Sequence, residues 1–195
     1  NLAKEIKISG IADVVRDHEF DDELMRSAGI RLKHPTYFYP MIEIKEGVLL
    51  EAGFDTVTPN VPCDISSWAY DHALETAGLK NLVDNRALRA SCYNPEYTFV
   101  EKMQAISTKF RQQQKTGEFG KNFMRHYYDL YKLLGTESVR KFLGTEPYLT
   151  HKNKRFRGAD EKGIAKNEAF LLGDAKVRKQ YQHQMDLTKK LYFND

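Results

Sequence analysis

Apolar residues recur at helical spacing through much of the second half of the chain. Four of them follow at intervals of three or four residues, which places them on one face of a helix: Phe99, Met103, Ile106 and Phe110. The tripeptide Asn94-Pro95-Glu96 precedes them with a capping side chain, a proline suited to the first turn and an acidic residue near the positive end of the helix dipole. The pattern predicts a helix that begins at this tripeptide.

The stretch RHYYDLYKLL, residues 125–134, carries a second stripe of this kind. With Phe123 one turn earlier, it predicts a helix over 119–134 that stops at Gly135, with its stripe in the core: Tyr127, Leu130, Tyr131 and Leu134. Asp129 lies about a quarter-turn off the stripe and one turn after Arg125. Two interpretations are open for this carboxylate. It forms a surface ion pair with Arg125, or it is a catalytic or ligand-binding group. Tyr128 lies off the stripe and is placed to line a cleft.

Weaker patterns predict the remaining elements. Residues 11–34 are polar and read as a helix, and two strands lie within 36–54 around a turn at 45–47. Further helices are expected over 64–78, near 137–143 and over 175–192, and a short strand over 87–93. Strands followed by a run of helices indicate an α+β fold.

Charge is distributed unevenly along the chain. Residues 1–100 contain 10 lysines and arginines against 16 aspartates and glutamates, whereas residues 101–195 contain 20 against 11. A basic second half favours contact with a polyanion such as nucleotide phosphates or RNA. The alternative is a solvated basic face without such a partner.

Several classes of protein are disfavoured by what the sequence lacks. It contains no Walker-type phosphate loop, no GxGxxG, no HExxH and no GxSxG, and its histidines never pair at metal-ligand spacing. No apolar run reaches the roughly 18 residues of a membrane span, and the N-terminus lacks an apolar signal region. We therefore expect a cytoplasmic protein without membrane contact, in which Cys63 and Cys92 are buried, reduced thiols.

Two further residues are candidates for chemistry. The stretch VLLEAG, residues 48–53, places Glu51 in an otherwise apolar strand, where a buried carboxylate needs a partner or a metal ion. The alternative is a glutamate of an edge strand that faces water. Lys102 lies at the margin of the stripe that begins at Phe99, where its ammonium either extends to water or holds a phosphate in a cleft.

Taken in order, these stretches resemble the AbiEii/AbiGii toxin family of nucleotidyltransferases, a branch of the DNA polymerase β-like superfamily. The resemblance rests on VLLEAG, NPEYTFVEKMQAI, RHYYDLYKLL and a late HKNKRFR, and covers roughly residues 36–193. It implies a toxin of a toxin–antitoxin or phage-defence system that uses Mg²⁺ to transfer a nucleotide from an NTP. The implied acceptor is tRNA, another RNA or a protein, and a cognate antitoxin is a possible partner.

The resemblance also assigns roles to individual residues. Glu51 is implied as a metal-site carboxylate, Lys102 as a catalytic residue that contacts the triphosphate, and Asp129 as an acidic residue needed for activity. Arg125 and Tyr128 are implied to bind the nucleotide. The implied architecture is the remnant of a mixed nucleotidyltransferase sheet with flanking helices over residues 1–93, followed by a helical domain over residues 94–195.

One departure from the family pattern is serious. The family has a Gly-Gly-Ser/Thr turn and an Asp-x-Asp pair before the LLE strand, and neither occurs here. The acidic alternation over residues 17–21 reads as helix or loop and lacks such a turn. We therefore expect the chain to be the C-terminal part of a longer enzyme and to be inactive alone. A non-catalytic helical module that binds nucleic acid or protein through the basic second half is the alternative function.

Overall fold

The computed structural model describes residues 2–21, 24, 26–36, 39, 45–77, 82–84, 86–120 and 122–189. Contacts divide the chain into two compact units, residues 1–56 and 57–195, which are described separately. The expected division between an α/β core over 1–93 and a helical domain over 94–195 stays a prediction.

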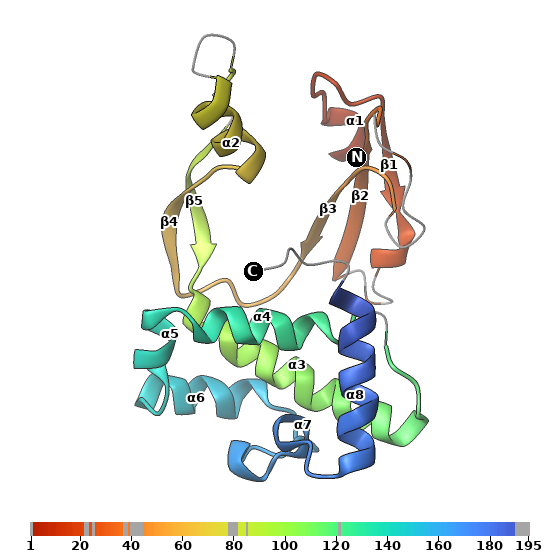
Figure 1. Ribbon diagram of the computed structural model, residues 1–195. Coiled ribbons are helices and arrows are strands. Elements are labelled where there is room, and N and C mark those ends of the chain that lie inside the picture. Colours follow the sequence, from red (N-terminus) through yellow and green to blue (C-terminus); the bar gives the residue numbers. More distant parts are fainter. Residues whose placement is uncertain are drawn as a thin grey trace. The chain divides into compact units, whose positions relative to one another are not determined.

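The first unit is built around a three-stranded antiparallel sheet (Figure 1). Helix α1 (Leu2–Glu5) precedes strands β1 (Asp13–Asp17), β2 (Ser27–Lys33) and β3 (Val48–Gly53), and the strand order is β1-β2-β3. Gly29 in β2 permits a close approach, because a Cβ there would lie 3.0 Å from the Phe20 side chain. A short 3-10 helix at His18–Phe20 supplies that side chain.

The helix predicted over residues 11–34 is wrong. This segment forms β1, the short 3-10 helix and β2 instead. The acidic residues over 17–23 suggested a polar helix, but the alternation in Gly29-Ile30-Arg31-Leu32 is a strand pattern, with Leu32 buried and Arg31 on the opposite face. The prediction over 36–54 is confirmed for β3. Its first strand falls mostly outside the described residues.

The second unit begins with a two-stranded antiparallel hairpin. Strand β4 (Asn60–Ile65) pairs with β5 (Ala87–Tyr93), and helix α2 (Trp68–Ala77) lies between them in the chain. The strand predicted over 87–93 is confirmed, and the helix predicted over 64–78 is confirmed from Trp68 onward. Strand β4 was missed because Pro62 argued against it, yet proline is tolerated in an edge strand. Cys63 and Cys92 are free, as predicted, but they are half-buried rather than buried in this hairpin.

Helices make up the rest of the second unit. Helix α3 (Pro95–Thr116) is followed by α4 (Arg125–Leu134) and α5 (Glu137–Phe142). Helices α6 (Glu146–Arg155), α7 (Glu168–Leu171) and α8 (Ala175–Thr188) complete it, with a 3-10 turn at Ile164–Lys166. Helix α3 is central, because α4, α5, α6 and α7 all contact it (Figure 1). The α+β class is confirmed.

Two hydrophobic clusters hold these helices together, and the predicted face of α3 contributes to both. The first contains Phe99, Val100, Met103, Val139, Tyr148 and Phe156. The second contains Ile106, Phe123, Met124, Ala169 and Tyr181, with Phe110 packed against it. Full burial of a valine, isoleucine, methionine or phenylalanine side chain contributes about 1.5–3 kcal/mol to the free energy of unfolding.

The two predicted helix starts and stripes are confirmed only in part. Helix α3 begins at Pro95, but the Asn94 side chain makes no capping hydrogen bond, and its Oδ1 is buried without a partner in the described structure. Helix α4 starts at Arg125 rather than near residue 119. Tyr127 packs in the second cluster, whereas Tyr131 and Leu134 are 69% and 37% exposed, so their predicted core positions are wrong.

Candidate active site

Lys102 and Asp129 meet between helices α3 and α4. The Lys102 Nζ atom donates to Asp129 Oδ2 at 2.7 Å, and the two side chains are 30% and 38% exposed. Packing fixes the positions of both, because the neighbouring Met103 is buried and Leu130 contacts both hydrophobic clusters. The pair therefore lies at the margin of the core with its charged groups reachable from solvent.

This contact bears on the first of the two interpretations of Asp129, whereas its catalytic or ligand-binding role stays a prediction. In the described structure its carboxylate pairs with Lys102, so the surface pair with Arg125 is wrong. Arg125 is exposed at the first turn of α4, and Tyr128 is half-buried with the Lys132 ammonium 5.5 Å from its ring centroid. The roles of Arg125 and Tyr128 in nucleotide binding stay predictions.

His126 lies in the same electrostatic environment. Its pKa is lowered to about 4, mainly because burial disfavours the imidazolium. The positive charges of Lys102, Lys109 and Arg125 lower it as well, and the negative charge of Asp129 acts in the opposite direction. The ring of His126 thus experiences three positive charges and one negative charge, a balance that favours an anionic ligand.

Glu51 lies in the first unit, on the edge strand β3, opposite Gly29 of β2. Its side chain is exposed, as the water-facing alternative requires, and it lines a shallow pocket of about 540 Å³ with Arg26, Ser27 and Asp55 among others. Within the described ranges, no three His, Cys, Asp or Glu side chains gather in a way that could hold a metal ion. One carboxylate is too few for a magnesium site, so we derive no step through a metal here.

The acidic alternation over residues 17–21 is engaged in ion pairs. Asp17 ends β1 and accepts from Arg31 Nε at 2.8 Å and from Lys45 Nζ at 3.2 Å. The Arg31 guanidinium is the main reason that the pKa of Asp17 lies below its usual range. Asp21 likewise pairs with Arg16 at 3.0 Å. The expectation that this segment is helix or loop is wrong at Asp17, which belongs to a strand.

Glu101, next to Lys102 in the chain, joins three elements. It accepts from the Tyr93 hydroxyl at 2.9 Å, and its Oε1 lies 3.6 Å from both His151 Nε2 and Arg155 Nε. The late His-Lys motif thus supplies His151 to a contact between α6, α3 and the end of β5. We interpret this part of the motif as architectural.

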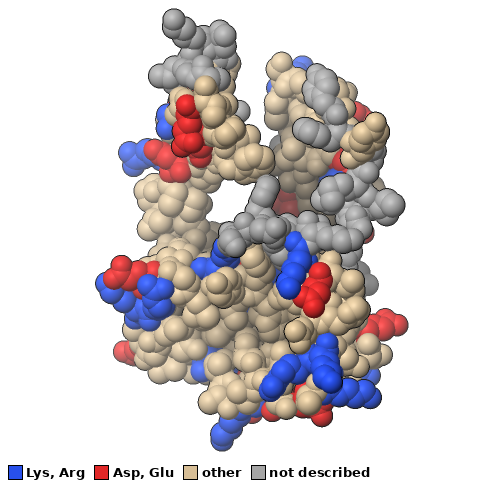
Figure 2. Space-filling model, viewed as in Figure 1, with Lys and Arg blue, Asp and Glu red and all other residues tan. Residues whose placement is uncertain are grey.

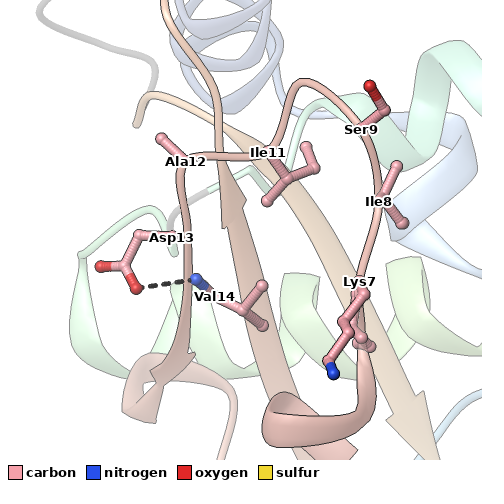
Figure 3. A pocket seen from close by; sticks show the side chains of 8 residues that line it. Lys7, Ile8, Ser9, Ile11, Ala12, Asp13 and Val14 are labelled. Carbon is pink, nitrogen blue, oxygen red and sulfur yellow. Dashed lines mark hydrogen bonds between the residues drawn. The ribbon is translucent and has the colours of Figure 1, made fainter.

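The pocket in Figure 3 lies in the first unit and offers no convergent chemistry. It has a volume of about 600 Å³ and is lined by residues 6–9 and 11–14, with Lys7 and Asp13 on opposite sides of the loop in this view. The Asp13 carboxylate accepts from the backbone N–H of Val14 at 2.9 Å. The candidate site therefore rests on the α3–α4 contact.

Basic side chains of the helical part do not merge into one patch on the face that Figure 2 shows. Lys and Arg form separate groups there, with Asp and Glu beside them. Among the described helices, none combines the length and the apolar character of a membrane span.

Comparison with known proteins places the chain in a family. The sequence model of the family described as "Nucleotidyl transferase AbiEii toxin, Type IV TA system" matches residues 2–191. No curated protein and no solved structure matches the chain. The match spans nearly the whole chain, and the protein belongs to the AbiEii family of nucleotidyl transferase toxins.

Two residues near the pair were not among the predicted site residues, namely Lys109 and His126. Lys109 follows Lys102 by seven residues, so both project from the same face of α3, and this spacing was available from the sequence. The environment of His126 depends on how α4 packs against α3, which no local pattern indicates.

Proposed function

We propose that the protein, as a toxin, transfers a nucleotide from an NTP to an RNA acceptor of the tRNA kind or to a protein acceptor. The bond between the α- and β-phosphates breaks, an acceptor oxygen bonds to the α-phosphorus, and pyrophosphate leaves. The contact between Lys102 and Asp129 carries this proposal. The resemblance assigns both residues to activity, they lie 27 residues apart in the chain, and their side chains meet at 2.7 Å. Nucleotide transfer depends mainly on positioned cations and carboxylates, which is the chemistry gathered here.

Each residue has a defined part in the proposal. Lys102 holds the triphosphate as a mobile point charge, and Arg125 at the start of α4 adds a planar guanidinium for phosphate oxygens. Asp129 orients the Lys102 ammonium and is the catalytic carboxylate. Tyr128 contributes to nucleotide binding beside them.

Mg²⁺ is part of the proposal as the cofactor of the full-length protein, with Glu51 as the described residue assigned to it. A chelator should then abolish transfer, and added Mg²⁺ should restore it. Glu51→Gln should raise the Mg²⁺ concentration needed for half-maximal transfer. An unchanged requirement would remove Glu51 from the proposal.

A transfer assay on the full-length gene product tests the function. The protein is incubated with each α-labelled NTP, Mg²⁺ and either tRNA or total cell protein, and label on the acceptor is counted. We expect Lys102→Ala and Asp129→Asn each to lower transfer by about hundredfold or more. The exposed pair Glu137–Lys141 on α5, with its atoms 2.7 Å apart, gives matched controls.

The controls separate catalysis from general effects of charge. Glu137→Gln and Lys141→Ala remove the same kinds of charge from another exposed pair and should retain full activity. Activity of Lys102→Ala and Asp129→Asn within a few-fold of wild type would contradict the proposed roles. Absence of transfer by the wild type with every NTP and both acceptors would contradict the function itself.

A further inference from the structure

His126 is a polar side chain of α4 to which the proposed function gives no role. Its ring is half-buried, and Nδ1 is buried without a hydrogen-bond partner in the described part of the chain. Such an atom calls for an explanation, because buried polar atoms in proteins are nearly always paired. The state of Nδ1 also determines which of the two ring nitrogens carries the proton.

The unpartnered Nδ1 indicates which tautomer the neutral ring adopts. One nitrogen of a neutral imidazole carries a proton and the other a lone pair. In protein interiors, an N–H group without an acceptor is rarer than an acceptor that lacks a donor. The proton therefore belongs on Nε2, which makes this atom the hydrogen-bond donor that the ring can present to an outside partner.

The surroundings of the ring favour an anion as that partner. Lys102 and Lys109 project from the same face of α3, and Arg125 precedes His126 on α4. All three act electrostatically on His126, and Asp129 is the carboxylate that opposes them. The Lys102 ammonium pairs with Asp129 at 2.7 Å. Lys109 is half-buried and follows Lys102 by seven residues in α3. The environment of the ring is thus net positive.

We propose that His126 contacts the substrate, donating a hydrogen bond from Nε2 to an oxygen of the polyphosphate chain of the nucleotide, with Lys109 as a second cation beside Lys102. This inference rests on the proposed function and deepens it, because it adds two residues and one hydrogen bond to the nucleotide site.

A bound polyphosphate should change the protonation of His126. In the free protein, burial and the neighbouring cations keep the ring neutral, with a pKa of about 4. Negative charge beside the ring favours the imidazolium, so the pKa of His126 should rise when the anion binds. By linkage, the anion should bind more tightly as the pH falls toward that raised pKa.

NMR titration of the full-length protein tests the inference, with inorganic tripolyphosphate as the probe. The ring resonances of His126, assigned by their loss in His126→Gln, are followed against pH with and without the probe. We expect the pKa of His126 to rise by about one unit or more in its presence.

Binding of the same probe to variants gives an independent readout. His126→Leu and Lys109→Ala should each weaken tripolyphosphate binding by about tenfold, because each removes one interaction with a charged group. His126→Gln should bind within about threefold of wild type, since its amide also presents an N–H. His183→Leu, on the exposed face of α8, is the matched control and should bind like the wild type.

The outcomes distinguish this inference from the proposed function. Tripolyphosphate binding without a change in the pKa of His126 would overturn the inference and leave the nucleotide site of Lys102 standing. So would equal weakening by His126→Leu and His126→Gln. No binding by the wild type would overturn the inference and count against the phosphate role of Lys102 as well.

Discussion

At the scale of single residues, the ion pair between Lys102 and Asp129 is too exposed to contribute much to the stability of the fold. Ion pairs with side chains about a third exposed contribute about 0–1 kcal/mol, since solvent screens them and two flexible side chains must be ordered. The core beside them, formed by residues such as Met103 and Leu130, does not depend on the pair. If both residues are catalytic, the variants Lys102→Ala and Asp129→Asn should therefore be folded but inactive.

The histidine beside this pair makes a prediction about pH. The pKa of His126 is lowered to about 4 in the folded protein, whereas the unfolded chain binds a proton near pH 6.5. Between these values the unfolded state holds more protons, so the free energy of unfolding should fall as the pH falls from about 6.5 to about 4. With the ring's partial exposure allowed for, we expect a loss of about 1–2 kcal/mol.

Chemical denaturation at a series of pH values checks this loss. His126→Gln should reduce the slope of the free energy of unfolding against pH. The slope should not vanish, because burial also lowers the pKa of His151. A slope that is the same in His126→Gln and wild type would contradict the neutral state of His126.

At the scale of elements, a buried carboxylate ties α3 to the segment that follows α6. The side chain of Asp160 is fully buried and accepts from Thr108 Oγ1 at 2.9 Å, from Arg111 Nη2 at 3.2 Å and from the backbone N–H of Arg157 at 3.0 Å. Nearby, Asn167 Nδ2 donates to Ser107 Oγ at 2.9 Å. Helix α3 thus carries a polar face for structure and a separate charged edge for the candidate site.

Asp160→Ala should lower the free energy of unfolding by about 1–3 kcal/mol, because it leaves the buried Thr108 hydroxyl without its acceptor and removes the acceptor shared by Arg111 and the backbone N–H of Arg157. Thermal or chemical unfolding measures the loss. Asp186→Ala, which removes an exposed carboxylate of α8 that pairs with Lys189, is the control and should change stability by about 0.5 kcal/mol or less. Equal effects of the two variants would refute the structural role of Asp160.

The sequence predicted an element correctly where the pattern that defines it lies within that segment. Helix α3 was predicted because its stripe and its proline lie within the segment itself. Strand β5 was predicted too, although only Tyr93 among its residues has a high strand preference. Strands β1 and β2 were missed because the acidic residues between them suggested one polar helix, whereas Arg16 and Arg31 pair with Asp21 and Asp17 in the fold.

The same reasoning applies to the candidate site. Asp129 could be singled out from its place beside the stripe of α4, but its partner could not, because the choice of Lys102 over Arg125 depends on the packing of two helices. The exposure of Tyr131 and the environment of His126 depend on that packing too. The resemblance to the family supplied what local patterns lack, an assignment of Lys102 and Asp129 to one site.

At the scale of the whole molecule, the distribution of charge bears on the acceptor. Residues 101–195 carry the excess of lysine and arginine, which on the visible face forms separate groups among acidic residues. If the acceptor is RNA, these lysines and arginines neutralise its phosphates and release the counterions condensed on them, so binding must weaken with salt. A protein acceptor would not impose this dependence to the same degree.

We therefore predict that the affinity of the full-length protein for tRNA falls about tenfold or more between about 50 and about 200 mM salt. Filter binding without NTP measures the affinity at each salt concentration. The double variant Lys176→Ala/Lys179→Ala on α8 should show a smaller slope of the logarithm of affinity against the logarithm of salt concentration. Affinity that barely responds to salt would exclude the basic half as an RNA-binding surface and favour a protein acceptor.

The central claim is that Lys102 and Asp129 act in catalysis and do not merely bridge two helices. Reversing the pair tests it most directly, with Lys102→Asp and Asp129→Lys combined in one full-length protein. The reversed pair keeps the ion pair between α3 and α4, so it should unfold within about 1 kcal/mol of wild type. We predict that it is nevertheless inactive in nucleotide transfer, because the ammonium and the carboxylate have exchanged places. Recovery of near wild-type transfer by the reversed pair would contradict the account.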